Sequence, residues 1–407
     1  MLPLSRTSAL KRLEAFIPDA GEVYTSGRNF DASPGASGAP SGLSAALRLR
    51  LVSEHEVIKA CLEAYSPQQV DKFVSEVIWR TYWKGWLAQR PSVWEDYCSD
   101  LSEAERELGS SRGLQTAYTQ AIEARSGIDC FDHWVTQLLE TGYLHNHARM
   151  WFASIWIFTL RLPWTLGAAF FLRHLLDGDT ASNTLSWRWV AGLQTRGKHY
   201  LARPSNIKRY TRGKFNPVGL LNTSAEPVDG PLPPEPSHLE DQPSLIRTTQ
   251  NPTAWYLDCD DLWGGLEIPM RPDDIILLNA RKLSDSRMDA PNENIARLHN
   301  KAMTEAIKFH HVDSIEIDLA DCQLVSDELN NRNIQCVHGF SPHVGLDSAR
   351  VGHWSKSLAE KGVSFFWFRR RWDSQLFPYA NKGFFGFKKS VWPFIEDLSF
   401  FESELCR

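Results

Sequence analysis

The sequence predicts a mainly α-helical domain followed by a smaller α/β domain. Apolar residues recur at helical spacing through most of the first half of the chain, whereas short apolar runs alternate with helical stretches later on. The segment between them is dense in Pro and polar residues, as in a linker or an extended surface strap. We therefore expect a helical domain over residues 1–221, a linker over 222–252 and an α/β domain over 253–407.

Residues 71–89 and 150–160 illustrate the helical part. The first segment places Phe73, Val77 and Tyr82 near helical spacing. The second is the most apolar stretch of the chain, but it is far shorter than the roughly 20 residues that a bilayer span needs. We therefore expect it to form a buried helix.

The last part of the chain predicts a parallel sheet, because strand-like and helix-like segments follow one another in turn. No Gly-rich phosphate fingerprint follows any of the strand-like segments, so a conventional dinucleotide or P-loop site is not expected there. The strand-like segments are 273–280, 314–319, 334–340 and 362–370, and the helical ones are 293–310 and 321–332.

Composition narrows the class of protein. The chain has 16 tryptophans in 407 residues, which suggests either large aromatic packing layers or a ring-stacking, redox-active interior. Its seven cysteines form no Cys-x-x-Cys pair, which fits a reducing compartment and gives no support to a metal site. The start lacks an apolar run long enough for a signal peptide, so we expect a cytoplasmic monomer without membrane association.

Charge is distributed unevenly along the chain. The formal net charge is −5, yet no Asp or Glu occurs from Thr180 to Ala225. A local basic face on an acidic protein is compatible with binding to nucleic acid. The basic residues in this stretch are Arg188, Arg196, Lys198, Arg203, Lys208, Arg209, Arg212 and Lys214.

Two loops carry polar groups that could face a ligand. The loop Ser41-Gly42-Leu43-Ser44 precedes a helical stretch, so its hydroxyls and backbone N–H groups could form either an ordinary N-cap or an anion site. The segment 141–150 crowds His145, Asn146, His147 and Arg149 beside an apolar helix. The His-x-His pair lacks a third ligand at a helpful spacing, so a hydrogen-bonding cluster is favoured over a metal site.

The segment 174–192 combines two carboxylates with two indoles. Asp177 and Asp179 flank a glycine; they could bind magnesium, cap the next helix, or pair with a buried arginine such as Arg149. Considered alone, capping is favoured. Trp187 and Trp189 lie two residues apart, so on a helix they point to different faces.

A fourth group lies on the segment 71–89. Glu76, Arg80 and Trp83 follow at i, i+4 and i+7, with Trp79 next to Glu76 at i+3. An exposed helix with one ion pair is the simple interpretation. Two indoles on a solvated face argue against it.

Taken in this order, the motifs resemble the flavin-binding helical domain of the DNA photolyase and cryptochrome family. The family pattern is a Tyr, a Ser-x-Leu-Ser loop, Glu-x-x-Trp-Arg, Thr-Gly-x-x-His-Asn-x-x-Arg-Met, and Asp-Gly-Asp-x-Ala-x-Asn followed by Trp-x-Trp. The matching residues are Tyr24, Ser41 to Ser44, Glu76 to Arg80, Thr141 to Met150 and Asp177 to Trp189. The resemblance covers roughly residues 20–217.

The resemblance implies FAD as the cofactor and a set of residues around it. Tyr24, Ser41, Leu43 and Ser44 are expected at the diphosphate and ribityl part of a U-shaped FAD. Around the isoalloxazine ring, Asp179 would accept from the ring edge and Asn183 would face the reactive nitrogen. An Asn at that place is the repair-type choice, whereas many sensor members carry an acid. The remaining cofactor contacts implied are Arg80, Arg149 and Asp177.

The resemblance also implies a DNA-lesion site. Glu76 and Asn146 would hydrogen-bond a flipped pyrimidine dimer, while Trp79 and Trp189 would stack against it; extruding a damaged base costs little, and stacking returns about 1–3 kcal/mol per base. Trp187 and then Trp164 would relay electrons to the flavin, with Trp94, Trp134 and Trp156 available for a third step. Further DNA contacts are expected at His147, Arg196, Lys198 and Arg203.

The function implied is light-driven repair of cyclobutane pyrimidine dimers in UV-damaged DNA by electron transfer from reduced FAD. The alternatives are a cryptochrome-like photosensor, repair of (6-4) photoproducts, and a flavin-free helical nucleic-acid-binding protein. Asn146 favours the cyclobutane dimer, because (6-4) enzymes tend to carry a histidine there. The chain has no room for an α/β antenna domain ahead of Tyr24, so it resembles a short branch of the family without that N-terminal domain.

Overall fold

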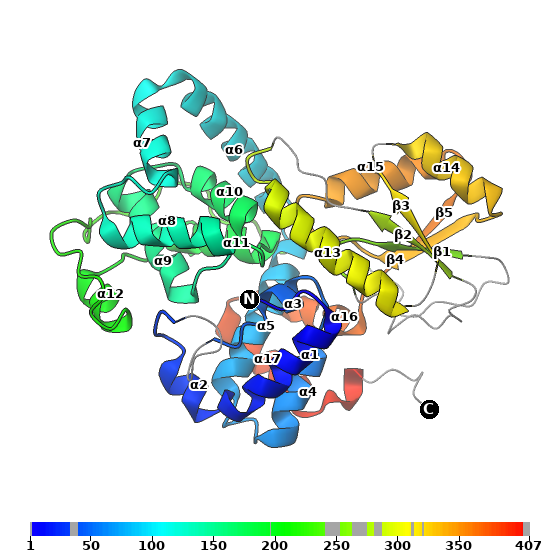
Figure 1. Ribbon diagram of the computed structural model, residues 1–407, viewed down its shortest axis with the longest axis horizontal. Helices are drawn as coiled ribbons and strands as arrows, with labels where there is room; N and C mark the ends of the chain where they lie inside the picture. The colour runs from blue at the N-terminus through cyan, green and yellow to red at the C-terminus, as the bar shows by residue number, and fades with distance from the viewer. Residues whose placement is uncertain are drawn as a thin grey trace.

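The computed structural model describes residues 2–32, 40–195, 197–240, 253–262, 275–280, 287–310, 313–319 and 321–401. Its first part is helical and its second part contains a parallel sheet, which confirms the predicted fold class (Figure 1). The helices of the first part are α1 (Arg6–Phe16), α2 (Glu22–Gly27), α3 (Ser44–Arg48), α4 (Glu54–Ala64), α5 (Asp71–Ala88), α6 (Ser92–Ser110), α7 (Arg112–Ile122), α8 (Asp129–Thr141), α9 (Asn146–Ser154), α10 (Trp164–His174), α11 (Thr180–Ala191) and α12 (Pro204–Tyr210).

The most apolar stretch of the sequence forms the end of α9 and the π-helical turn η2 (Ile155–Thr159). Trp151, Phe152 and Trp156 are fully buried there, as expected for a helix in the core. Within the described residues, no helix is long and apolar enough to cross a membrane.

The sheet has five parallel strands in the order β3-β2-β1-β4-β5. The first strand, β1, was not expected as a strand from the sequence, yet it is the centre of the sheet. From β1 the chain adds β2 and then β3 on one side of the sheet, and it then adds β4 and β5 on the other side. The order of the strands therefore reverses between β1 and β4, which is the topological switch point of the sheet. The elements are β1 (Thr253–Leu257), β2 (Ile275–Ala280), α13 (Glu293–His310), β3 (Ser314–Ile317), α14 (Cys322–Asn331), β4 (Cys336–Phe340), α15 (Ser348–Ala359) and β5 (Ser364–Phe368).

The two faces of the sheet belong to different hydrophobic cores. On β1, Ala254 and Tyr256 pack into a core with Trp354 of α15, while Trp255 and Leu257 face the opposite side. That second side shares one continuous core with α13 and the helical part, through residues such as Met303. Figure 1 shows α13 between the sheet and the helices, with α14 and α15 on the far face.

After β5 the chain returns to the helical part through α16 (Arg371–Leu376), η5 (Phe377–Tyr379), α17 (Phe384–Glu396) and η6 (Leu398–Phe401). Helices α16 and α17 pack on α5. The Trp372 indole donates to the hydroxyl of Thr81 at 2.9 Å, and the Tyr82 hydroxyl donates to the carbonyl of Lys382 at 2.9 Å. The ends of the predicted domains stay predictions, but these contacts tie the last helices to the helical part.

The described portion of the predicted linker, residues 222–240, contains neither helix nor strand. It lies against the end of α5, where the N–H of Ser237 donates to the carbonyl of Gln89 at 2.8 Å and Arg90 donates to the carbonyl of Pro234 at 2.9 Å. Over these residues the segment has the contacts of a surface strap.

Candidate functional site

Asp179 sits at the start of α11 and joins it to α5. Its carboxylate accepts from the N–H of Ser182 at 2.9 Å, which makes Asp179 the N-cap of α11. The same carboxylate pairs with Arg80 at 3.0 Å and with Lys84 at 3.4 Å. Burial alone raises the pKa of this carboxyl, but Lys84, Arg80 and Arg48 outweigh burial and hold its pKa well below the usual range. Asp179 is therefore anionic.

Asp177 forms a bidentate ion pair with Arg149 of α9. The two N···O distances are 2.9 and 2.8 Å, and the side chains are 5% and 25% exposed. The sequence left open magnesium binding, helix capping and pairing with an arginine for these two carboxylates. In the structure Asp177 pairs with Arg149, and Asp179 caps α11. Both contacts come from Nη2 of Arg149, while its Nε donates to the carbonyl of Leu144 at 2.9 Å, so the guanidinium is held at two points.

Asn183 and Trp187 lie one turn apart on α11. The Asn183 amide donates to the carbonyl of Ala168 at 2.9 Å, which fixes the orientation of the side chain. Trp187 is buried against α10, where a Cβ on Gly167 would lie 2.3 Å from its ring. Trp187 is 2% exposed and Trp189 is 37% exposed, which confirms that the two indoles point to different faces.

The two predicted relay tryptophans have separate ring contacts. Trp187 contacts Trp156 with ring centroids 6.3 Å apart, whereas Trp164 contacts Tyr97 at 5.7 Å. The relay itself stays a prediction.

In the loop before α3, Gly42 adopts the left-handed backbone conformation. Gly42 has φ +72°, a conformation that costs glycine little. The next residue, Leu43, is fully buried. The Ser44 hydroxyl is buried and has no hydrogen-bond partner among the described residues, while the Ser41 hydroxyl accepts from the N–H of Leu43 at 3.3 Å.

Tyr24 is buried in α2 beside this part of the core. Its ring contacts Phe16 at 5.7 Å and Phe73 at 5.3 Å. Burial raises the pKa of its hydroxyl, so the phenol is neutral.

Arg28 contacts the predicted lesion residue Glu76 and also His145, which precedes the predicted lesion residue Asn146. The guanidinium of Arg28 pairs with Glu76, and the Arg28 carbonyl lies 3.0 Å from Nε2 of His145. His145 caps α9 by accepting from the N–H of His147 at 3.1 Å, which leaves Asn146 exposed at the first position of the helix. Burial raises the pKa of Glu76, opposed by Arg28.

Trp79 is stacked on Phe384 of α17. The ring centroids are 3.5 Å apart with an interplanar angle of 6°. This contact covers one face of an indole that the sequence predicts as a lesion platform. The other predicted platform, Trp189, is partly exposed and stacks on Tyr200 at 5.7 Å.

The acid-free stretch is exposed over most of its basic residues. Arg188 is an exception: it is 4% exposed and faces Asp96 and Asp100, so it does not belong to a basic surface. Arg196 lies outside the described residues. The predicted contact His147 packs between Trp151 and Tyr210. The exposed basic residues are Lys198, Arg203, Lys208, Arg209, Arg212 and Lys214.

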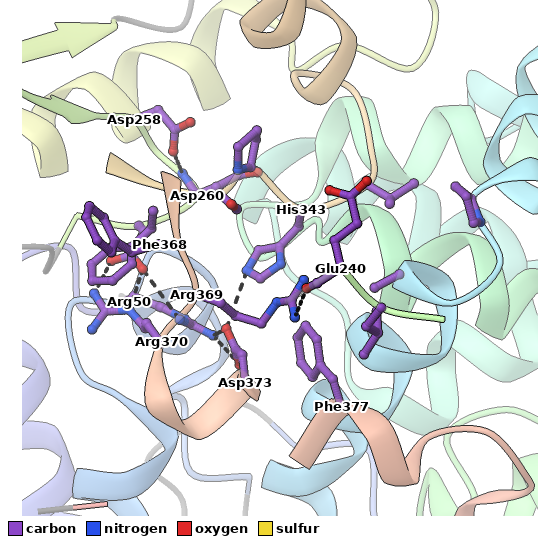
Figure 2. A pocket seen from close by; sticks show the side chains of 18 of the residues that line it. Arg50, Glu240, Asp258, Asp260, His343, Phe368, Arg369, Arg370, Asp373 and Phe377 are labelled. Carbon is purple, nitrogen blue, oxygen red and sulfur yellow. Dashed lines mark hydrogen bonds and ion pairs between the residues drawn. The ribbon is translucent and has the colours of Figure 1, made fainter. Parts of the chain in front are cut away.

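A cavity of about 360 Å³ lies next to this site, at the carboxyl ends of β1, β4 and β5. Figure 2 shows its charged side chains directed toward one another. Arg50 pairs with Asp373 at 2.7 Å and Arg370 with Asp261 at 2.6 Å. Burial, reinforced by Lys84 and Arg50, holds the pKa of His343 well below its usual range. The cavity is thus a junction at which the α/β part meets α5.

Three residues of the site were not predicted from the sequence. Arg28 and Lys84 meet their partners 48 and 95 positions away, and Phe384 lies in the part of the chain expected to be α/β. No local motif marks such contacts. Within the described residues, no group of three or more His, Cys, Asp or Glu side chains could hold a metal ion.

Comparison with known proteins finds a family match in the helical part of the chain. Residues 73–219 match the FAD binding domain of DNA photolyase, a span that includes α5 to α12 except the first two residues of α5. This confirms the resemblance expected from the motifs, because residues 73–219 of this chain are similar to the FAD binding domain of DNA photolyase. FAD is the cofactor of that domain.

Curated relatives are similar over the same part of the chain. The deoxyribodipyrimidine photo-lyase of Synechococcus sp. is 32% identical over 200 residues, which cover 46% of this chain and 38% of the relative. The Neurospora crassa enzyme of the same name is 32% identical over 196 residues, covering 47% and 31%. The chain thus matches well under half the length of these relatives.

Two solved structures are also similar. They are a class III photolyase from Agrobacterium tumefaciens, 27% identical, and a cryptochrome from Synechocystis sp., 24% identical. Each has a TM-score of 0.42 and covers 51% of this chain, which spans 42% and 43% of those chains.

Proposed function

We propose that the protein is a light-driven DNA-repair flavoprotein that splits cyclobutane pyrimidine dimers. The observation that carries this proposal is the pair of ion-pair sites at the start of α11, where Arg149 holds Asp177 and where Arg80 and Lys84 hold Asp179. The relatives named deoxyribodipyrimidine photo-lyase support the same function.

The residues present suit FAD. A buried hydroxyl without a protein partner, as at Ser44, is costly unless a ligand completes its hydrogen bonds, and a diphosphate oxygen is a strong acceptor. Arg149 is a quarter exposed, so it can reach a ligand while it holds Asp177. When bound and reduced, FAD supplies the electron that light transfers to the dimer.

The side chains around the cofactor hold it and set its charge. Asn183 is a neutral amide fixed by Ala168, so it brings no negative charge toward an anionic reduced ring. Trp187, buried one turn further along α11, would pass an electron toward the same ring. Both assignments depend on FAD lying at the start of α11.

The pyrimidine dimer would bind to Glu76 and Asn146, which lie near Arg28. Glu76 is 36% exposed at its side chain, and Asn146 is exposed at the start of α9, so both can reach an extruded base. The Arg28–Glu76 pair keeps the carboxylate in place. A carboxyl whose pKa is raised can also donate a hydrogen bond when protonated.

A repair assay tests this proposal. The purified, photoreduced protein is incubated with oligonucleotides that carry a cyclobutane dimer or a (6-4) photoproduct, single- and double-stranded, in light and in darkness. We expect loss of the cyclobutane dimer in light only. Bound FAD without repair of either lesion would support a photosensor, repair of only the (6-4) product would change the substrate, and a colourless protein would remove all three functions.

Variants separate lesion contacts from cofactor contacts. Glu76→Gln and Asn146→Ala should slow repair while leaving the flavin spectrum unchanged. Glu63→Gln, an exposed glutamate of α4, is the matched control and should repair at the wild-type rate. Loss of FAD from the Glu76 or Asn146 variant would show that these residues serve the cofactor instead.

A further inference from the structure

The exposed face of α17 carries an aromatic ring, Phe385, close to the predicted lesion contact Trp79. Phe385 is 84% exposed, the most exposed large hydrophobic side chain in the described part of the chain. Scattered apolar residues on a surface are ordinary. Phe385 differs because it ends a series of ring contacts that begins in α5.

The series runs outward from the helical part. Trp83 and Trp79 lie 5.2 Å apart, Trp79 and Phe384 lie 3.5 Å apart, and Phe384 and Phe385 lie 5.9 Å apart. Phe384 is buried, so Phe385 is the ring that meets solvent. The series therefore presents an aromatic face just outside the site that holds Trp79.

Two exposed lysines, Lys382 and Lys389, flank Phe385 in the sequence, whereas Lys388 is paired with Asp71 of α5. Phe385 and Lys389 lie four residues apart on α17, so they share a helix face. Lys382 precedes the helix and is held by the Tyr82 hydroxyl, which donates to its carbonyl at 2.9 Å. Both lysine side chains are exposed. An exposed ring with exposed lysines three residues before it and four residues after it is complementary to a nucleotide, which offers a base to stack and a phosphate to pair.

We infer that Phe385, with Lys382 and Lys389, binds the DNA strand beside the flipped dimer. Glu76 and Trp79 lie one turn apart on α5. Glu76 contacts Arg28 at the end of α2, and Trp79 contacts Phe384 of α17. A strand whose dimer reaches Glu76 thus passes the exposed face of α17. This inference rests on the proposed function, because it takes damaged DNA as the substrate. Since Phe384 occupies one face of Trp79, Phe385 offers the accessible ring on this side.

The inference is tested by the affinity of the full-length, FAD-loaded protein for dimer-containing oligonucleotides in darkness, measured by fluorescence anisotropy. Phe385→Ala should weaken binding about 5- to 150-fold, the range that about 1–3 kcal/mol of base stacking corresponds to. Phe385→Trp should restore it. The control is Leu324→Ala, which truncates a side chain that is 67% exposed on α14, and it should bind like the wild type.

The lysines are tested by the salt dependence of the same affinity. Lys389→Gln should lower the slope of log K against log salt by about 0.7–0.9, as expected for one lost phosphate contact. Lys301→Gln, an exposed lysine of α13, should leave the slope unchanged.

The outcomes separate this inference from the proposed function. Repair in light with unchanged affinity in Phe385→Ala overturns the inference alone. Weakened binding in Phe385→Ala without any photorepair by the wild type overturns the proposed function alone. A wild type that binds no DNA overturns both, and self-association that Phe385→Ala abolishes would assign this face to a second copy of the chain.

Discussion

Helix α5 has two faces that differ in their chemistry. One face directs Arg80 and Lys84 to the carboxylate of Asp179, in a network whose side chains are all at most 11% exposed. The other face directs Trp79 and Tyr82 to α17 through ring contacts. Buried charges are costly unless they are paired, whereas stacked rings stabilise by packing alone. The charged face therefore joins α5 to the start of α11, and the aromatic face joins α5 to α17 near the end of the chain.

The largest expected effect is on the charged face. Asp179→Asn leaves Arg80 and Lys84 buried without their shared carboxylate, which should lower the free energy of unfolding by about 3–5 kcal/mol. Urea denaturation measures this loss. The exposed variant Glu63→Gln should change stability by less than about 0.5 kcal/mol. A loss as small as this in Asp179→Asn would show that the charged network is dispensable.

The aromatic face should respond to truncation of Phe384, which is 6% exposed. Phe384→Ala should lower stability by about 3 kcal/mol, because it leaves a cavity beside Trp79. A double-mutant cycle with Trp79→Ala should give a coupling of about 0.5–1.5 kcal/mol. Additive effects would mean that the stack contributes only through the area each ring buries.

Lys84 gives the charged face a dependence on pH. Burial, with Arg80 nearby, lowers the pKa of Lys84 to about 8 from 10.5. The folded protein thus releases this proton near pH 8, whereas the unfolded chain keeps it until about pH 10.5. Stability should therefore rise between pH 8 and 10, by about 2 kcal/mol, because the unfolded state binds more protons there. In Lys84→Met this rise should disappear from the urea denaturation midpoints, and a rise of equal size would exclude Lys84 as its source.

The smallest effects come from two helical glycines. A Cβ on Gly85 would lie 2.9 Å from the Cα of Phe377, whereas one on Gly109 of α6 would meet nothing within 4 Å. Gly109→Ala should therefore stabilise the protein by about 0.5–1 kcal/mol through helix propensity. Gly85→Ala should destabilise it by about 1 kcal/mol, because crowding exceeds that gain. Equal melting temperatures for both variants would contradict the close packing of η5 on α5.

Features that depend on residues close together in the sequence could be predicted. The capping by Asp179, the opposite faces of Trp187 and Trp189, and the alternation of strands and helices follow from spacing of a few residues. The pairing of Arg149 with Asp177 was one of the alternatives that the sequence left open. Contacts over long separations could not be predicted in this way: Trp79 meets Phe384 some 300 residues later, and no periodicity encodes that meeting.

The predicted parallel sheet also shows this limit. Its outer strands were visible as apolar runs, but β1 follows directly on residues that read as linker, and its central place depends on pairing with both β2 and β4. Similarly, the cavity at the switch point joins Arg50 to Asp373, which only the folded topology brings together.

The most direct test of the cofactor site is the affinity of the apoprotein for FAD in two serine variants. Ser44 and Ser374 both carry buried hydroxyls without a hydrogen-bond partner among the described residues, so replacing either by Ala removes no hydrogen bond seen among them. If Ser44 binds the diphosphate, Ser44→Ala should weaken FAD binding at least about tenfold, since a hydrogen bond to a charged group contributes about 1.5–3 kcal/mol. Ser374→Ala should bind FAD like the wild type, and both apoproteins should melt at the wild-type temperature. Equal FAD affinity in all three proteins would contradict the placement of the cofactor at this loop.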